Sequence, residues 1–304
     1  MVNYSVTVVI VNYNSGEMLV NCINQVLAST VPTRIIISDN ASTDNSLHLV
    51  ETAFKSNADV TIHRNNANRG FSAGNNAVYA DITTPYILYL NPDCFIETNT
   101  IEQLINTMNE FPDAGMVGCL VTNTDGTEQA GCRGLTPTPS RVFNQMFKLA
   151  KLFPDNPKCS GYLLSDKQLP NQPIEVELIS GSCMFVRKEA IEQVGLLDDN
   201  YFLYCEDYDW FYRFLAGNWK IIFNPRIIVM HIKSFSTRQI PLKVLGYKAR
   251  GMWRYHNKFF KRNSSRVTTL VVRTGIISRL LLLGSIVLVK KSWKKIFGIL
   301  NRVS

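Results

Sequence analysis

The 304-residue sequence has no C-x-x-C pair, no G-x-G-x-x-G fingerprint and only four histidines. Its seven cysteines are scattered through apolar segments, which favours buried, reduced thiols over a zinc or disulfide framework. The N-terminus has no basic region followed by an apolar core and a cleavage site, so we expect no signal peptide. Dinucleotide-dependent hydride transfer is disfavoured, because Gly16 stands alone after the first apolar run.

Acidic residues are absent after Asp209, although the chain has 32 Lys and Arg against 24 Asp and Glu. Residues 241–304 hold 15 of the basic residues, which leaves a net charge of −7 in the first 240 residues. Such one-sided charge is typical of a polyanion partner, either nucleic acid or an anionic membrane surface. The chain has no nucleic-acid-binding motif, so we expect no nucleic acid and favour the membrane surface.

The basic segment also has no long uncharged run, because its longest, residues 280–289, has ten residues. About 20 are needed to cross a bilayer. Lys290, Lys291, Lys294 and Lys295 surround Trp293 directly after this run. The pattern predicts a helix that lies at an anionic leaflet without spanning it. The alternative is a helix that packs on the rest of the protein and has its charges solvated.

Short β-branched runs alternate with amphipathic segments over the first 110 residues. We expect strands at residues 6–11, 34–38, 60–62 and 86–90, and helices at 18–27, 46–54, 72–80 and 100–110. This alternation predicts an α/β fold with a mostly parallel, doubly wound sheet. Residues 123–175 contain six prolines and are expected to form a loop-rich insertion that covers the ligand cleft.

Polar side chains follow each predicted strand, and ligands of such sheets bind at the carboxyl ends of strands. These residues are Asn12 and Asn14, Asp39 and Asn40, Asn65 and Asn68, and Asn91 and Asp93. Asp93 supplies a hard oxygen, which suits the Mg²⁺ or Mn²⁺ that neutralises a diphosphate. The alternatives are an ordinary turn aspartate at 93 and helix capping by Asp39 and Asp44.

Three carboxylates lie among aromatic residues in the segment 201–210, which reads YFLYCEDYDW. A carboxylate flanked by apolar surface is more basic than usual, which favours Glu206 and Asp207 as general-base candidates. The alternative is a helix N-terminus with acids that complement the helix dipole, and this explains Asp209 well. His231 ends the apolar run 227–230, and a structural role and a ligand role both stay open for it.

These segments together resemble the GT-A glycosyltransferases of family 2, in particular the rhamnosyltransferase-like branch. Matching runs occur in order at residues 9–14, 38–46, 68–76, 90–93, 180–184 and 202–210, and they end with Arg213 and His231. The resemblance implies a GT-A catalytic domain over residues 1–240 and a basic, helical, membrane-associating extension over 241–304. Within the catalytic domain, residues 1–122 would bind the nucleotide sugar and residues 123–240 the acceptor.

The resemblance also implies roles for the matching residues. Asp207 would be the catalytic base, supported by Glu206, and Asp93 and His231 would hold the divalent cation. The acceptor would lie against Gly181, Ser182, Tyr204 and Trp210. The donor would contact Asn12, Tyr13, Asp39, Asn40, Asp44, Asn68, Gly70, Phe71, Asn75, Asn91 and Asp93. Asn91 replaces the first Asp of the family's Asp-x-Asp, which leaves fewer carboxylates on the metal.

The implied activity is an inverting, Mg²⁺- or Mn²⁺-dependent transfer of a sugar from a nucleotide diphosphate. The expected donor is dTDP-L-rhamnose, with a UDP-hexose as the alternative. The expected acceptor is a lipid-linked glycan or a polysaccharide, in O-antigen or capsule synthesis, and the enzyme would be peripheral at the cytoplasmic face of the inner membrane. An alternative of another class is a non-catalytic protein that binds nucleotide sugars or polyanions.

Overall fold

The structure, a computed structural model, describes residues 5–232 and 240–303, with side chains of the last helix described up to residue 290 and at 293. Its contacts divide the chain into two compact units. Unit 1 is Met1–Phe202 with Glu206–Ser236, and unit 2 is Leu203–Cys205 with Thr237–Ser304.

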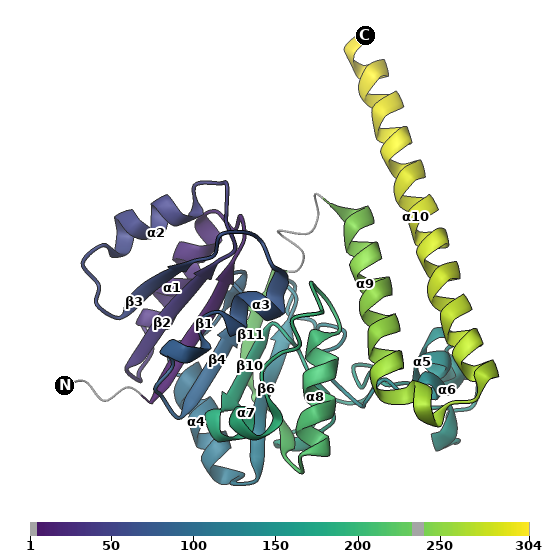
Figure 1. Ribbon diagram of the computed structural model, residues 1–304, viewed down its shortest axis with the longest axis horizontal. Helices are drawn as coiled ribbons and strands as arrows, with labels where there is room; N and C mark the ends of the chain where they lie inside the picture. The colour runs from purple at the N-terminus through teal and green to yellow at the C-terminus, as the bar shows by residue number, and fades with distance from the viewer. Residues whose placement is uncertain (1–4, 233–239, 304) are drawn as a thin grey trace. The chain divides into compact units, whose positions relative to one another are not determined.

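Unit 1 is an α/β unit whose strands and helices alternate over its first half (Figure 1). Its elements are β1 (Val6–Asn12), α1 (Glu17–Leu27), β2 (Thr33–Asp39), α2 (Ser46–Phe54), β3 (Val60–Arg64), α3 (Gly70–Asn76), η1 (Tyr79–Asp81), β4 (Tyr86–Leu90), β5 (Cys94–Phe95), α4 (Thr100–Glu110), β6 (Ala114–Thr122), β7 (Arg133–Gly134), α5 (Pro139–Met146), α6 (Leu149–Leu152), η2 (Pro157–Cys159), β8 (Ile174–Val176), β9 (Leu178–Ile179), β10 (Cys183–Arg187), α7 (Lys188–Val194), α8 (Glu206–Ala216) and β11 (Lys220–His231).

The main sheet has the strand order β3-β2-β1-β4-β10-β6-β11-β5, and β8 also pairs with β11. The four strands from β3 to β4 are parallel, as predicted. The second half is mixed, because β10 runs antiparallel to both β4 and β6. The prediction of a mostly parallel sheet is therefore wrong for this half: the chain leaves the insertion, turns at Gly181 and Ser182, and enters the sheet in the opposite direction.

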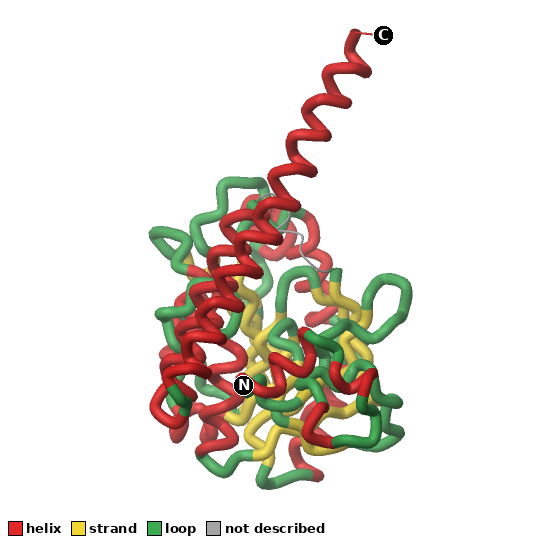
Figure 2. The backbone as a smooth tube through the Cα atoms, turned by 90° about the vertical axis from the view of Figure 1, so that its right-hand side faces the viewer, coloured by secondary structure: helices red, strands yellow, loops and turns green. Residues whose placement is uncertain are grey.

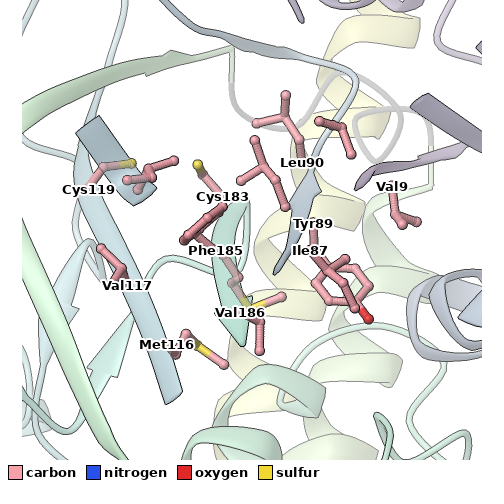
Figure 3. Packing of buried hydrophobic residues seen from close by; sticks show 14 of the residues in the cluster. Val9, Ile87, Tyr89, Leu90, Met116, Val117, Cys119, Cys183, Phe185 and Val186 are labelled. Carbon is pink, nitrogen blue, oxygen red and sulfur yellow. The ribbon is translucent and has the colours of Figure 1, made fainter. Parts of the chain in front are cut away.

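The core of unit 1 lies along the central strands. Val8 and Ile10 of β1 and Ile35 and Ile37 of β2 are completely buried. Figure 3 shows the neighbouring part, where apolar side chains of β4, β10 and β6 pack beside one another. Strands buried on both faces read as continuous apolar runs without alternation. The carboxyl ends of β1, β2 and β4 are thereby held at one edge of a rigid sheet.

The insertion at residues 123–175 has more structure than predicted. It contains α5, α6 and the short strands β7 and β8, and β7 pairs with β9 in a separate two-stranded sheet. Its buried Arg133 bonds the Glu128 carboxylate at 3.0 Å and the Lys167 carbonyl at 2.7 Å. These bonds connect the two ends of the insertion. The prediction that the insertion covers the cleft stays a prediction.

Unit 2 is helical. It contains α9 (Pro241–Tyr255), the π-turn η3 (His256–Phe260), η4 (Lys261–Asn263) and α10 (Arg266–Val303). Figure 2 shows α10 as one unbroken helix. Its 25-residue stretch Arg266–Lys290 contains an 18-residue window with a mean hydropathy of 1.8 and is long and apolar enough to cross a membrane. The prediction that the segment is too short to span a bilayer is therefore wrong on length and composition, because Arg273 and Arg279 interrupt the uncharged sequence but not the helix.

Candidate active site

The first part of the site is a polar network at the carboxyl ends of β1 and β2. The Asn12 amide donates to the Asp39 carboxylate at 2.8 Å and to the hydroxyls of Ser42 and Ser46 at 3.0 and 2.9 Å. Asp39 also accepts from the Ser42 backbone N–H at 3.1 Å. The network is buried, so it fixes the rotamers of Asn12 and Asp39. Tyr13 lies beside it with its side chain partly exposed.

Asp44 has a structural role in this network. Its carboxylate accepts from the backbone N–H of Ser46 at 3.1 Å and from the backbone N–H of Gly16 at 2.9 Å. It therefore holds the first turn of α2 against the loop after β1, a structural role one residue before the helix N-cap, Asn45. A contact between Asp44 and the donor stays a prediction.

The segment around Gly70 and Phe71 is held against the sheet and against Phe202. The Asn40 amide donates to the Gly70 carbonyl at 2.9 Å, and the Phe71 N–H donates to the Phe202 carbonyl at 2.9 Å. Gly70 has φ +89°, and a Cβ there would lie 2.1 Å from the Phe202 oxygen, so only glycine fits. Asn68 and Asn75 support the same turn. The donor segment predicted from the sequence thus meets the residues that precede α8.

A candidate metal centre lies where β5 pairs with the end of β11. Cys94 is opposite His231 in the register, and the Asp93 carboxylate lies 3.2 Å from Nε2 of His231. The ligand atoms of Asp93, Cys94 and His231 all lie within 4.8 Å of one another. Cys94 is fully buried and its thiol donates to the Ser182 carbonyl. The oxygen of Asp93 and the imidazole of His231 therefore form a donor pair that fits a divalent cation.

Gly181 and Ser182 join this centre to the predicted base. The Ser182 carbonyl accepts from the Asn91 N–H at 2.9 Å and from the Cys94 thiol at 3.4 Å, one on each side of Asp93. On the other side, a Cβ added at Gly181 would lie 2.9 Å from Oδ2 of Asp207. One dipeptide therefore separates the turn that carries Asp93 from the Asp207 carboxylate. The two groups belong to one site.

The acid pair at the start of α8 is perturbed by its surroundings. Burial raises the pKa of Asp207 to about 6, against hydrogen bonds from its own and the Tyr208 backbone N–H, which lower it. Burial, and then the neighbouring charge of Asp207, raise the pKa of Glu206 well above its usual range. Asp207 is thus a carboxylate of increased basicity, as a general base requires. Glu206 is a buried carboxylic acid beside it.

One of the predicted acceptor residues, Trp210, lies in the core of unit 1. Trp210 is completely buried, its indole N–H donates to the Gly195 carbonyl at 2.9 Å, and its ring packs on Tyr89 and Phe214. It is a core residue, so its assignment to the acceptor was wrong. Tyr204 belongs to unit 2, where its ring faces the Lys248 amine at 4.2 Å.

Asp209 has a structural role, as expected. Its fully buried carboxylate bonds Arg213 at 2.8 Å, and that guanidinium also donates to the carbonyls of Val194 and Leu196. Asp209 thus anchors α8 to the end of α7. This bond fixes the helix that starts with Glu206 and Asp207.

Sequence reasoning missed two residues of the site. Gln129 is buried and makes two hydrogen bonds to His231, and Phe202 supplies the carbonyl that holds Phe71. Gln129 lies in the insertion, outside every matching run, and gave no local signal. Phe202 lies in a matching run, but it acts through its backbone, which the side-chain pattern does not reveal.

The mixed sheet, the candidate metal centre at the end of β11 and the acid pair on α8 are the arrangement expected of a GT-A glycosyltransferase that uses a nucleotide-sugar donor. A family model described as "Glycosyl transferase family 2" matches residues 7–195, and the chain belongs to this family.

Curated relatives agree with this assignment. The chain is 28% identical over 247 residues to the N-acetylglucosaminyl-diphospho-decaprenol L-rhamnosyltransferase of Mycobacterium tuberculosis, which covers 77% of this chain and 78% of that protein. It is 25% identical over 211 residues to the low-salt glycan biosynthesis hexosyltransferase Agl10 of Haloferax volcanii, with 68% and 60% coverage.

Solved structures share the fold. The mannosyltransferase PcManGT of Pyrobaculum calidifontis, in complex with GDP-Man and Mn²⁺, gives a TM-score of 0.58 at 13% identity, covering 90% of this chain and 69% of that one. S. aureus TarS 1-349, in complex with UDP-GlcNAc, gives 0.56 at 12% identity, covering 90% and 72%.

The close approach of Gly181 to Asp207 yields a first prediction. We expect Gly181→Ala to lower kcat about tenfold, because the added methyl group must push the Asp207 carboxylate from its position, and a small misplacement of a base is costly. Gly246→Ala is the matched control, since nothing lies within 4 Å of a Cβ there. Steady-state kinetics of both variants test this. Equal kcat values would show that Gly181 does not constrain the base.

Proposed function

We propose that this chain transfers L-rhamnose from dTDP-L-rhamnose, with inversion, to a hydroxyl group of a lipid-linked sugar in bacterial cell-surface polysaccharide synthesis. The observation that carries the proposal is the Gly181–Ser182 link between Asp93 and Asp207. It joins a cation-binding group and a proton acceptor in one site, as a single displacement requires. The named activity of the mycobacterial relative favours rhamnose as the sugar and a lipid-linked acceptor.

In this mechanism Asp207 accepts the proton of the acceptor hydroxyl as that oxygen attacks the anomeric carbon from the face opposite the diphosphate. Asp93 and His231 would hold Mg²⁺ or Mn²⁺, which supplies the positive charge that stabilises the leaving diphosphate. The buried Asn12–Asp39 network would present a fixed polar edge to the base and ribose of the donor. Gly181 and Ser182, beside Asp207, would border the acceptor.

One assay separates this proposal from its alternatives. Purified protein with Mn²⁺ and a polyprenyl-diphosphate-linked N-acetylglucosamine is given dTDP-L-rhamnose or one of several UDP-hexoses, and the released nucleoside diphosphate is measured. We expect acceptor-dependent release of dTDP from dTDP-L-rhamnose. Release of UDP alone would mean that the donor is a UDP-hexose. A hexose is the next candidate because the relative Agl10 is a hexosyltransferase. Binding of donors without any release or transfer would favour the non-catalytic alternative.

We further propose that the protein is peripheral at the cytoplasmic face of the inner membrane, with one face of α10 in the lipid. Along Arg266–Lys290, one side of the helix is exposed and has no charge. Its apolar residues are Val267, Leu270, Val271, Ile277, Leu281, Leu282, Leu288 and Val289. The 23 positions from Val267 to Val289 extend over about 34 Å at 1.5 Å per residue. The length and the basic surroundings of this face fit an anionic leaflet.

Two charged residues of this stretch, Arg273 and Arg279, lie on its other side, towards α9. The Arg273 guanidinium lies 6.0 Å from the Trp253 ring, and Nη1 of Arg279 lies 4.0 Å from the Met252 sulfur. Residues of both helices line one small cavity: Leu245, Ala249 and Met252 of α9, and Ile276, Arg279, Leu280 and Leu283 of α10. The middle of the apolar stretch of α10 thus packs against α9, a helix with basic residues.

This pairing favours a helix that lies in the membrane surface over one that crosses it. If α10 spanned the bilayer with α9 still attached, Lys248 and Arg250 of α9 would be drawn towards the hydrocarbon. Each charge at the centre of a bilayer costs about 3 kcal/mol. With α10 in the plane, its uncharged face enters the acyl region and α9 stays in the headgroup region.

We expect Leu281→Asp to weaken binding to vesicles of phosphatidylglycerol and phosphatidylethanolamine about 100-fold. An aspartate in hydrocarbon costs about 3 kcal/mol, which corresponds to this loss of affinity. Asn263→Asp introduces the same charge at an exposed position outside the apolar face and should bind almost as wild type. Flotation of the full chain measures both. Equal flotation of the two variants would contradict insertion of this face, and resistance of the wild type to alkaline carbonate extraction would contradict a peripheral location.

A further inference from the structure

The Gln129 side chain makes both of its hydrogen bonds to one residue, His231. Its Nε2 donates to the His231 carbonyl at 2.9 Å, and its Oε1 lies 2.9 Å from Nδ1 of the His231 ring. The two residues are 102 positions apart, and Gln129 is 4% exposed. The Gln129 backbone is held as well, because its N–H donates to the Val121 carbonyl at 2.8 Å. The glutamine is therefore a fixed clamp on the histidine.

The clamp determines where the ring carries its hydrogen. The His231 carbonyl only accepts hydrogen bonds, so the amide nitrogen of Gln129 must face it and the amide oxygen must face Nδ1. An oxygen that only accepts requires an N–H at Nδ1. In the neutral ring Nε2 then carries the free lone pair.

That lone pair points at a second acceptor. Nε2 of His231 lies 3.2 Å from the Asp93 carboxylate, and both side chains are mostly buried, at 10% and 13% exposed. Two electron-rich atoms that converge from the turn before β5 and from the end of β11 repel each other unless a positive charge lies between them. A proton on Nε2 or a divalent cation can supply that charge, and a cation bound to Nε2 needs the tautomer that Gln129 selects.

We propose that Gln129 is a positioning residue for the metal centre: it fixes the tautomer and the orientation of His231, so that Nε2 is available to the divalent cation. The proposal rests on the metal-dependent transfer proposed above, but it is independent of which sugar is moved. Groups that hydrogen-bond the far nitrogen of a histidine ligand change metal affinity about 10- to 100-fold.

The test measures Mn²⁺ binding itself by electron paramagnetic resonance, with dTDP present and no acceptor. We expect Gln129→Leu, which removes both hydrogen bonds, to weaken Mn²⁺ binding at least tenfold. Gln129→Glu keeps an acceptor for Nδ1–H and should lose less affinity than Gln129→Leu. Gln193→Leu is the matched control, because Gln193 also joins a ring N–H, that of Trp219, to a backbone carbonyl, that of Gly217.

Two outcomes would overturn the proposal. One is a Gln129→Leu variant that is folded and binds Mn²⁺ as tightly as Gln193→Leu. The other comes from the wild type alone: ¹⁵N chemical shifts with diamagnetic Mg²⁺ and dTDP that show His231 protonated at Nε2 and bare at Nδ1. Absence of Mn²⁺ binding by the wild type would reject the metal centre itself, whereas equal binding by both variants would reject only the role of Gln129.

Discussion

We expect Asp207→Asn to lower kcat by a factor of about 10² to 10⁴ without unfolding the protein, because the amide cannot take the proton of the acceptor hydroxyl. Turnover is measured as the acceptor-dependent release of nucleoside diphosphate. Asp81→Asn, an identical change at an exposed position just before β4, should leave kcat unchanged. An Asp207→Asn enzyme with more than a tenth of the wild-type kcat would show that another group accepts the proton.

The pH dependence of kcat/KM gives an independent test of the role of Asp207. Burial raises the pKa of Asp207 to about 6, so kcat/KM should fall as the pH is lowered through about 6. A carboxyl whose pKa is raised by folding favours the folded state most when it is protonated, and this contribution is lost as the pH rises through about 6. At pH 7.5 the Asp207→Asn variant should therefore have a Tm at or above that of the wild type. A lower Tm would mean that lost activity reflects lost structure.

The second large effect is expected at Asp93. Asp93→Asn should lower kcat at saturating Mn²⁺ by about 10² to 10⁴, because the electrostatic stabilisation of the leaving diphosphate is weakened. Since Asn91 already stands in place of a carboxylate, Asp93 supplies the only acidic side chain of the Asn91-Pro92-Asp93 turn. Its loss therefore removes more of the local negative charge than it would beside a second aspartate.

The Asp93 prediction is measured by titrating each variant with Mn²⁺ after treatment with EDTA. The wild type should lose its activity in EDTA and regain it with Mn²⁺ or Mg²⁺, and Asp93→Asn should need at least tenfold more Mn²⁺ for half-maximal rate. Asp81→Asn again serves as the control. Full activity of the wild type in EDTA would contradict a metal-dependent transfer.

The first half of the fold could be predicted because its signals are local. Runs such as Val6–Asn12 are β-branched and continuous, and the expected helices at 46–54 and 100–110 have the observed bounds. The direction of β10 could not be predicted, because it depends on how the chain leaves the insertion. The continuity of α10 was missed because a run of uncharged residues was taken for the apolar stretch, although a helix can turn its arginines to one side.

The residues of the site likewise divide into those with a local sequence signal and those without one. Asp93, Asp207 and His231 could be predicted as site residues because each follows or begins an element with a clear pattern, and the resemblance to a family supplied their roles. Trp210 was misassigned because aromatic residues beside an acid serve a sugar site and a core equally well. In the structure its indole N–H is bonded to Gly195 and its ring is buried. The contacts of Gly181 with Asp207 and of Gln129 with His231 join distant segments, so no local pattern encodes them.

The central claim is that Asp93 and Asp207 act on opposite sides of one anomeric carbon, whose bond to the diphosphate breaks as its bond to the acceptor oxygen forms. The most direct measurement is the anomalous scattering of Mn²⁺ in crystals grown with dTDP. We predict one Mn²⁺ bonded to the Asp93 carboxylate and Nε2 of His231, with the diphosphate on the same ion and the Asp207 carboxylate facing it across Gly181. A Mn²⁺ bonded to Asp207, or a diphosphate in a cavity that Asp207 does not reach, would contradict the account.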